Sequence, residues 1–232
     1  MQCSRCRGEA VLSQRYSGLS LCRRHLREDV EAKARREIRA QGGIRPGDRM
    51  AVAFSGGPQG AALARFLLRT FGERRDTSLL ALGLPGEAPV METAARSLGL
   101  EWIPVPGGDA GESPAAAAAR AGATVLVCPD CLDDLAGRVL ARVMEGKVPE
   151  GGRRPAPRTL TPFRRIPREE IRLYAEGIGV PWEEVPSREP RDGREELAAA
   201  LLADHEARHP SAPHALLRLW DSLEGSGRGE TD

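Results

Sequence analysis

Short apolar runs alternate with longer stretches of helical spacing through the middle of the chain. The runs predict strands at 50–54, 78–84, 101–105 and 124–127, and the stretches predict helices at 59–71, 88–98, 114–121 and 132–145. Strands that alternate with helices at this spacing predict a parallel, doubly wound sheet, with its ligand crevice at the carboxyl ends of the strands. The expected fold class is α/β and Rossmann-like.

The segments on either side of this region have a different character. A charged helical stretch ends at the helix stop Gln41-Gly-Gly43, and Pro167 opens a further predicted helix with acids in its first turn. C-terminal helices are predicted at 194–207 and 211–223. We divide the chain into a compact metal-binding unit at 1–26, a basic linker helix at 27–43, the α/β domain at 44–185, a C-terminal helical segment at 186–224 and a disordered tail at 225–232.

The overall charge is close to neutral. Its formal value is +1, so no net field draws the chain toward nucleic acid or an anionic membrane. No run approaches the roughly 20 apolar residues that cross a bilayer, and the N-terminus lacks the apolar centre of a signal peptide. We therefore expect a soluble cytoplasmic protein without a membrane partner.

Four residues of metal-binding type stand in two closely spaced pairs near the N-terminus. Cys3-x2-Cys6 and Cys22-x2-His25 match the spacing of a structural zinc knuckle, in which two tight turns bring four ligands into a tetrahedron. A closed four-ligand set leaves no open coordination position, so we expect a Zn²⁺ ion that supports folding rather than chemistry. The alternative is a set of unrelated buried thiols.

Arginines gather in two parts of this near-neutral chain. One cluster lies in the first forty residues and includes Arg23, Arg24 and Arg27, and a second includes Arg164 and Arg165. Local basic faces can follow a phosphate backbone, so these residues are the candidate RNA contacts. The alternative is that they only solvate two helices. His205, His209 and His214 have irregular spacing on a polar segment and are expected at the surface.

The run Met50-Ala-Val-Ala-Phe-Ser-Gly-Gly57 leads a predicted strand through glycines into a helix. Such a turn presents unpaired backbone N–H groups at the positive end of the helix dipole, which suits a phosphate. Cys128-Pro-Asp-Cys131 follows another predicted strand, so both segments are expected at the carboxyl edge of the sheet. We treat them as one candidate site.

These features, in this order, resemble the tRNA 2-thiolation branch of the PP-loop ATP-pyrophosphatases, the TtcA/TtuA-like proteins. In that family an N-terminal zinc finger precedes a Rossmann-like domain whose first strand ends in Ser-Gly-Gly-x-Asp-Ser. Segments 122–136 and 160–175 look like the family's Gly-His-Asn-x-Asp-Asp and Pro-Leu-x-x-Ile-Pro-x-x-Glu-Val-x-x-Tyr-Ala motifs, and 209–217 looks like the start of its C-terminal helix. The resemblance covers about 1–223 and implies the PP-loop type of α/β fold.

The resemblance implies ATP, with Mg²⁺, on the PP-loop, adenylation of a tRNA base oxygen and delivery of sulphur by cysteines. Matched position by position, the nucleotide-binding residues would be Ser55, Gly56, Gly57, Gln59, Gly60, Asp133 and Asp134.

The chain departs from the family at several motif positions. Gln59 and Gly60 stand where the family has Asp and Ser, Pro58 removes a backbone N–H from the loop, and Asp130 replaces the motif histidine. The family's Cys-x-x-Cys before the alanine helix is absent, and its later cysteine is Val185. We therefore expect no iron–sulphur cluster.

Cys128 and Cys131 are not the family's cysteine pair, although they lie at the same edge of the predicted sheet. They are the candidate catalytic residues, as a relocated redox or sulphur-carrying pair. The alternatives are metal ligation together with outside ligands, or no chemistry. A helix N-terminus favours the thiolate, whereas the carboxylates of Asp133 and Asp134 oppose it.

Two functions follow from the resemblance. The favoured one is a degenerate member that binds tRNA, an active paralogue or both, with weak or absent ATP-pyrophosphatase activity. The other is active ATP-dependent tRNA 2-thiolation on a variant loop. A sulphur-carrier protein and a second copy of the chain are further expected partners. A third, plainer interpretation is a metal-stabilised α/β module for another nucleotide.

Overall fold

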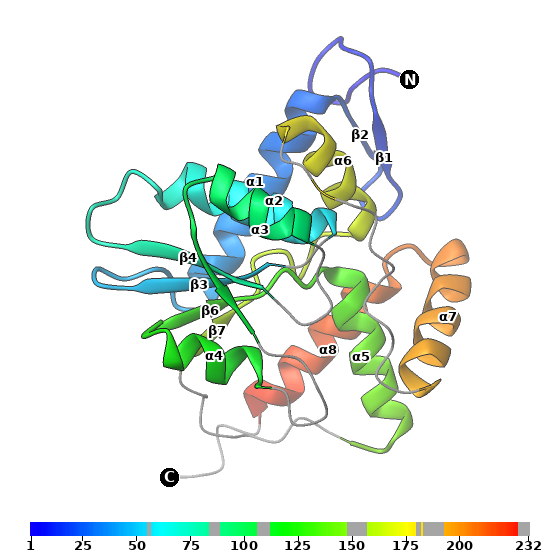
Figure 1. The fold of residues 1–232 in the computed structure, drawn as a ribbon. Coiled ribbons are helices and arrows are strands. Elements are labelled where there is room, and N and C mark those ends of the chain that lie inside the picture. Colours follow the sequence, from blue (N-terminus) through cyan, green and yellow to red (C-terminus); the bar gives the residue numbers. More distant parts are fainter. Residues whose placement is uncertain are drawn as a thin grey trace.

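A five-stranded parallel sheet forms the centre of the protein (Figure 1). Its strands are β3 (Arg49–Phe54), β4 (Ser78–Gly83), β5 (Glu101–Pro104), β6 (Val125–Val127) and β7 (Arg158–Leu160). They lie in the order β5-β4-β3-β6-β7, and every neighbouring pair is parallel. Because the chain returns to pair β6 on the free side of β3, the order switches at β3. In sheets of this kind ligands bind beyond the carboxyl ends at the switch point.

Eight helices are present in the described part of the chain, and four of them connect successive strands of this sheet. They are α1 (Arg23–Ala40), α2 (Pro58–Phe71), α3 (Pro89–Ser97), α4 (Pro114–Arg120), α5 (Leu132–Met144), α6 (Arg168–Ile178), α7 (Gly193–Arg208) and α8 (Ala212–Ser226). The computed structural model describes residues 1–54, 57–83, 89–105, 112–147, 157–179, 182 and 193–226. Among the described helices, none has the length and apolar character needed to cross a membrane.

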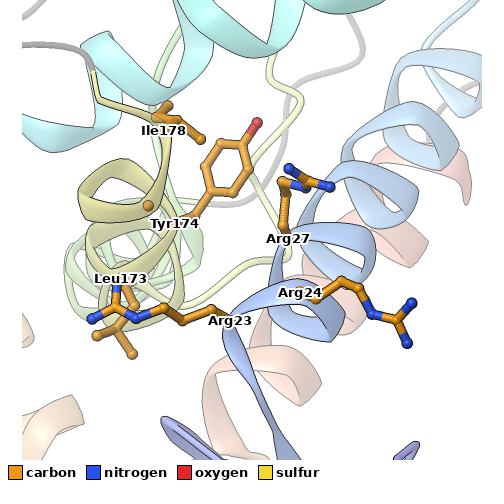
Figure 2. A pocket seen from close by; sticks show the side chains of 7 residues that line it. Arg23, Arg24, Arg27, Leu173, Tyr174 and Ile178 are labelled. Carbon is orange, nitrogen blue, oxygen red and sulfur yellow. The ribbon is translucent and has the colours of Figure 1, made fainter. Parts of the chain in front are cut away.

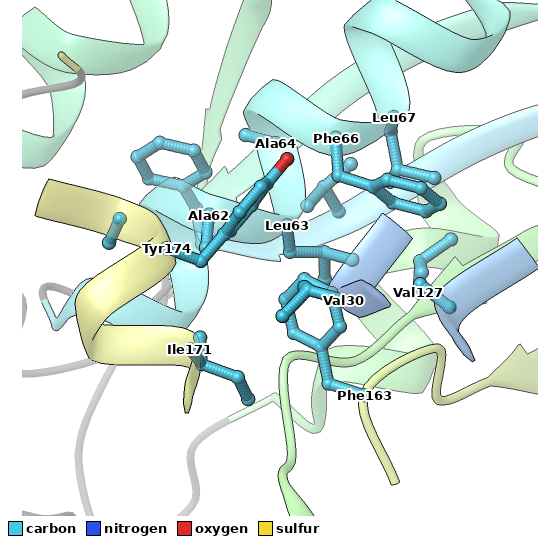
Figure 3. Close-up of a cluster of buried hydrophobic side chains, with 14 of the residues drawn as sticks. Val30, Ala62, Leu63, Ala64, Phe66, Leu67, Val127, Phe163, Ile171 and Tyr174 are labelled. Atoms are coloured by element: carbon cyan, nitrogen blue, oxygen red, sulfur yellow. The ribbon is translucent and has the colours of Figure 1, made fainter. Parts of the chain in front are cut away.

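The two faces of the sheet are buried by different helices. On one face, Met50, Val52 and Phe54 of β3 pack with residues of α1, α2 and α6 in a single apolar cluster, part of which is drawn in Figure 3. On the other face, Ala51 and Ala53 pack against α4. Alternate side chains of a strand point to opposite faces, so β3 is apolar on both sides, as expected of a central parallel strand.

The N-terminal unit is a small antiparallel hairpin, β1 (Leu12–Gln14) and β2 (Leu19–Leu21). It leads directly into α1, and Figure 1 shows it at one end of the molecule beside α6. At the other end, α5, α7 and α8 pack on one another through a separate apolar cluster that includes Leu132, Val139 and Trp220.

The expected doubly wound α/β fold is confirmed. The predicted strands and helices are all found, within a few residues, in the described part of the chain. The hairpin and β7 were not predicted. β7 is only three residues long and lies between Pro157 and Pro162, so it has too few positions for a period-2 pattern. The tail at 227–232 lies outside the described residues.

Candidate functional site

Cys3, Cys6, Cys22 and His25 come together at the junction of the hairpin and α1. Their ligand atoms all lie within 4.8 Å of one another. The sulphur atoms of Cys6 and Cys22 are 3.8 Å apart, and Nδ1 of His25 is 3.2 Å from the sulphur of Cys3 and 3.4 Å from that of Cys22. In a tetrahedral zinc site with Zn–S bonds of about 2.3 Å, two sulphurs are separated by about 3.8 Å. The group therefore fits a zinc knuckle.

Backbone donors surround the sulphurs of this metal group. The N–H groups of Arg5 and Gly8 point at the sulphurs of Cys3 and Cys6, each at 3.4 Å. Burial raises the pKa of Cys3, but the donors, including the Arg5 N–H and the His25 ring, outweigh it and lower the pKa to about 6. Thiolate is the form that binds a metal, so Cys3 is arranged to supply it. The Gly8 N–H lowers the pKa of Cys6, but burial and the sulphurs of Cys22 and Cys3 outweigh it and raise that pKa.

A buried polar network joins the N-terminal unit to the body of the protein. The Tyr16 hydroxyl donates to Glu170 on α6 at 2.5 Å, and Nζ of Lys33 donates to the Tyr16 oxygen at 2.6 Å. Lys33 also forms ion pairs with Glu170 at 3.1 Å and with Asp29 at 2.7 Å. The Arg5 guanidinium donates to Asp29 at 2.8 Å. Burial raises the pKa of Glu170, against the opposing effect of Lys33. The metal group is thereby held in a fixed position relative to α6.

The arginines expected to contact RNA fall into two separate places. Arg23, Arg24 and Arg27 lie exposed in the first turns of α1 and line a pocket of about 260 Å³ between α1 and α6 (Figure 2). That end of α1 has no acid in its first turn. Cations are disfavoured at the positive end of a helix dipole, so the helix contributes to an electropositive surface there.

The second arginine pair is bonded within the protein. Arg164 and Arg165 both donate to Asp221 of α8, and Arg165 also pairs with Glu37 of α1 at 3.0 Å. Glu37 lies ten residues after Arg27 on the same helix, which is about 15 Å along the axis at 1.5 Å per residue. The structure therefore does not bring the two sets together.

The turn from β3 into α2 retains the strand–glycine–helix arrangement. Gly57 is the N-cap of α2 in extended backbone, and Pro58 occupies the first helical position. The backbone N–H at that position would be unpaired in any helix, so proline removes a group that could have contacted a phosphate. The Gln59 side chain folds back, with its amide oxygen 3.2 Å from where a Gly57 Cβ would lie. Ser55 and Gly56 lie outside the described residues.

The acids and cysteines after β6 are bonded to one another and to α6. Asp134 accepts from the backbone N–H and from the thiol of Cys131, each at 2.9 Å, and pairs with Arg168 at 2.5 Å. Asp133 accepts from the Arg168 backbone N–H at 2.8 Å. Burial, followed by the two carboxylates, raises the pKa of Cys131 well above its ordinary value. Cys131 is therefore a thiol at neutral pH, whereas Cys128 is half-buried.

Several contacts near the metal group could not be predicted from a local sequence pattern. Tyr16 and Glu170 are 154 positions apart, so no local pattern predicts their bond. His214 was expected at the surface, and this is wrong: its ring lies 4.6 Å from the Tyr16 ring, and its Nε2 atom is buried with no hydrogen-bond partner among the described residues. Burial and nearby cations, Lys33 first among them, lower its pKa to about 4.

Comparison with known proteins gives matches of two kinds. Residues 2–27 match the family described as 2-thiouridine synthetase TtuA, N-terminal LIM domain. Among solved structures, the U34-tRNA thiolase NcsA from Methanococcus maripaludis, solved with its 4Fe–4S cluster, matches with a TM-score of 0.81 at 17% identity, over 97% of this chain and 87% of that one. No curated protein sequence matches this chain.

Weaker structural similarities reach the NAD synthetases. The NAD+ synthetase from Burkholderia pseudomallei has a TM-score of 0.46 at 15% identity, over 88% of this chain and 89% of that one. The NH3-dependent NAD synthetase from Campylobacter jejuni has a TM-score of 0.44 at 10% identity, over 92% and 98%.

Fold and metal group together define an α/β protein with a parallel sheet, the fold of that thiolase, and an N-terminal metal-binding knuckle. The match of residues 2–27 and the match of the fold agree with the resemblance that the sequence showed to the TtcA/TtuA-like proteins.

One expectation about cofactors is wrong. The absence of an iron–sulphur cluster was inferred from cysteines missing at the family's positions. The thiolase with this fold carries a 4Fe–4S cluster, and the present chain has a cysteine–histidine group able to bind a metal. Missing cysteines at two expected positions therefore do not exclude such a cluster.

Proposed function

We propose that this protein binds tRNA within a thiolation system, alone or with an active paralogue, and that its own ATP-pyrophosphatase activity is weak or absent. One observation carries the proposal: Arg23 and Arg27 beside the metal group have no ion-pair partner among the described residues, whereas Asp133 and Asp134 at the strand ends are bonded to Arg168. The two arginines beside the knuckle are free to contact a ligand, whereas the aspartates at the edge of the sheet are already hydrogen-bonded within the protein.

The basic surface beside the knuckle supports contact with an RNA backbone. Guanidinium groups match phosphate geometry and remain charged at any physiological pH. Each phosphate contact releases about 0.7 to 0.9 counterions, so binding through such contacts weakens as salt is raised. With two or three contacts, tRNA binding should weaken by about 7- to 40-fold between 50 and 200 mM salt. A response much flatter than this would contradict phosphate contact by these arginines.

The strand-end groups support weak nucleotide chemistry. A nucleotide with Mg²⁺ needs carboxylates that can reach the metal ion, and Asp134 is already paired with Arg168 and capping α5. Pro58 lacks the N–H that a phosphate would use at the first position of α2. Cys131 as a buried thiol is a poor nucleophile.

Active ATP-dependent tRNA 2-thiolation is the second candidate. It is favoured by the strand–glycine–helix turn kept at the carboxyl end of β3, next to the switch point of the sheet. In this case Ser55, Gly56 and Gly57 would hold the phosphates, and Cys128 and Cys131 would carry sulphur. An iron–sulphur cluster and a sulphur-carrier protein belong to this candidate.

Calorimetry with ATP and Mg²⁺ separates the two candidates. The experiment compares the wild type with Gln59→Asp and with Gln59→Asp/Gly60→Ser, which restore the family's polar residues. Under the proposal, ATP binding appears or strengthens at least about tenfold in the restored variants, or 1.4 kcal/mol. Tight binding and tRNA-dependent pyrophosphate release by the wild type would instead establish the active enzyme. Zinc, iron and acid-labile sulphide, measured on the same anaerobic preparation, identify the metal.

A further inference from the structure

The pocket between α1 and α6 has two chemically different walls (Figure 2). Arginines of the first turns of α1 form one wall. Leu173, Tyr174 and Ile178 of α6 form the other, and the Tyr174 ring is itself buried. With a volume of about 260 Å³, the pocket falls just below the 300–1,000 Å³ typical of drug-sized ligands. It therefore suits one small ligand that is apolar at one side and anionic at the other.

Two of the arginines face this space. Figure 2 shows Arg23 reaching along α6 toward Leu173, and Arg27 across from the Tyr174 ring, whereas Arg24 points away from α6. Arg24 contacts the ring of His25 at 3.1 Å and Glu28 at 4.0 Å. Within the described part of the chain, Arg23 and Arg27 have no carboxylate partner, and both are exposed. The charges of Arg23 and Arg27 are therefore not neutralised by an ion pair in the described structure, although the Glu31 carboxylate lies nearby and accepts from the Tyr174 hydroxyl at 3.3 Å.

Gly177 lines the pocket without a side chain. It lies in the last turn of α6, in a backbone conformation that other residues adopt readily. A Cβ atom at this position would meet no heavy atom within 4 Å. Glycine is a poor helix former, and no steric need for it exists in the described structure. A larger side chain would change the helix propensity at this position and the space in the pocket.

We propose that this pocket holds one unpaired RNA nucleotide, with its phosphate on Arg23 and Arg27 and its base against Leu173 and Ile178. The proposal rests on the proposed function for RNA as the ligand and goes beyond it by naming an unpaired nucleotide. Single-stranded RNA is recognised by bases splayed into pockets and stacked on apolar or guanidinium surfaces. A base inside a duplex could not enter, so the pocket would prefer single strands.

Filling the pocket without changing its charge tests the proposal. Gly177→Leu fills it, and Gly177→Ala is the matched control that alters helix propensity but leaves most of the space. The probes are a labelled RNA strand of about twelve nucleotides and the same strand annealed to its complement. We expect Gly177→Leu to weaken single-strand binding at least about tenfold and to change duplex binding less than about twofold. Thermal melting shows that each variant is folded.

A second pair of variants tests the basic wall. Arg27→Gln should weaken single-strand binding about three- to tenfold and lower the salt dependence by about one counterion. Arg36→Gln is the control: Arg36 is exposed on the same helix, nine residues or two and a half turns from Arg27, and so on the opposite face. It should leave single-strand binding within about twofold of the wild type.

The outcomes distinguish this proposal from the proposed function. If the wild type binds tRNA but Gly177→Leu binds the single strand equally well, the pocket proposal is wrong and the function stands. Equal binding of single strand and duplex by the wild type would also overturn the pocket alone. Absence of binding to tRNA and to both probes removes both proposals. Displacement of the RNA strand by a polyglutamate peptide at equal concentration would identify an acidic peptide as the occupant instead.

Discussion

The knuckle end of α1 and the carboxyl edge of the sheet use the same kinds of residue in opposite ways. At the knuckle, three cysteines and a histidine lie at metal-binding distance, and nearby Arg23 and Arg27 have no carboxylate partner in the described structure. At the edge of the sheet, Cys131 donates to Asp134, which in turn is paired with Arg168. The first region is arranged to bind something from outside the chain, and the second is bonded within it.

The two regions show that the type of a residue does not decide whether its side chain is free to bind a ligand. Asp133 and Asp134, which match the Gly-His-Asn-x-Asp-Asp motif, would be interpreted as nucleotide ligands on sequence alone. In the structure they cap α5 and fix the start of α6, which are structural tasks. A polar group already satisfied inside the protein has to break its existing bonds before it can bind a ligand.

Cys22→Ser should disrupt the knuckle far more than Cys131→Ser disrupts the edge of the sheet. Cys22 supplies one of four metal ligands, and a structural zinc site contributes on the order of 10 kcal/mol to the folding of its unit. We expect lost metal and fast amide exchange over residues 1–27. Serine at position 131 keeps a donor for Asp134 and is a preferred N-cap, so its cost should stay below about 1 kcal/mol.

The measurements for this pair are metal content and hydrogen exchange. Equal metal content in wild type and Cys22→Ser would show that the four residues do not form one site. Loss of tRNA-dependent activity in Cys131→Ser, with unchanged stability, would return Cys131 to a catalytic role and remove the contrast between the two regions.

Asp134→Ala should destabilise the fold by about 2 kcal/mol. The change removes the acceptor for the Cys131 N–H and thiol and the ion-pair partner of Arg168, and the pair is only partly exposed. The measurement is the urea unfolding free energy. Glu196→Gln on α7 is the control, because Glu196 is exposed and should change stability by less than about 0.5 kcal/mol. Unchanged stability with lost ATP binding would place Asp134 in a nucleotide site.

The sequence predicts one of these regions better than the other. Ligand spacing identifies Cys3, Cys6, Cys22 and His25 because two short pairs close a tetrahedron almost independently of the rest of the chain. The periodicity of apolar residues likewise predicts the alternation of strands and helices. Both signals are local, and the structure confirms what they predict about the fold.

Bonds between distant segments leave no such local pattern. Arg168 meets Asp134 across 34 positions, and Arg165 meets Asp221 across 56, so whether an arginine is available or bonded depends on the tertiary arrangement. For the same reason Arg164 and Arg165 looked equivalent to Arg23 and Arg27 in the sequence. The partly buried state of His214 depends on Tyr16, almost 200 residues earlier along the chain.

His214 should make the contact between α8 and the N-terminal unit sensitive to acid. Burial, and then the charges of Lys33, Arg165 and Arg218, lower its pKa to about 4, below the value of about 6.5 expected when unfolded. The unfolded chain therefore binds the proton more readily than the folded chain. The contribution of His214 to the free energy of unfolding is complete above pH 6.5 and falls as the pH is lowered toward 4. With allowance for partial exposure, the free energy of unfolding is lower by about 1 kcal/mol at pH 5.5.

Urea unfolding at pH 7.5 and pH 5.5 measures this effect. His214→Phe keeps a ring against Tyr16 and should remove about 1 kcal/mol of the pH dependence. His205→Gln, at an exposed position on α7, is the control and should behave as the wild type. An identical pH dependence in His214→Phe and wild type would show that His214 is not neutralised on folding.

The smallest expected change in stability belongs to Arg27→Gln, and its comparison with Arg165→Gln is the sharpest test of availability. Arg27 is exposed and has no ion-pair partner in the described structure, so its loss should alter the unfolding free energy by less than about 0.5 kcal/mol. Arg165 pairs with Asp221 and Glu37, so its loss should cost about 1 kcal/mol.

For tRNA binding the order should reverse, because only Arg27 has its charge available to a phosphate. Urea unfolding and salt-dependent tRNA binding on the same preparations measure both quantities. The comparison fails if removal of either arginine lowers both stability and tRNA binding, or lowers neither. Internal ion pairs would then not decide which arginines of this chain contact RNA.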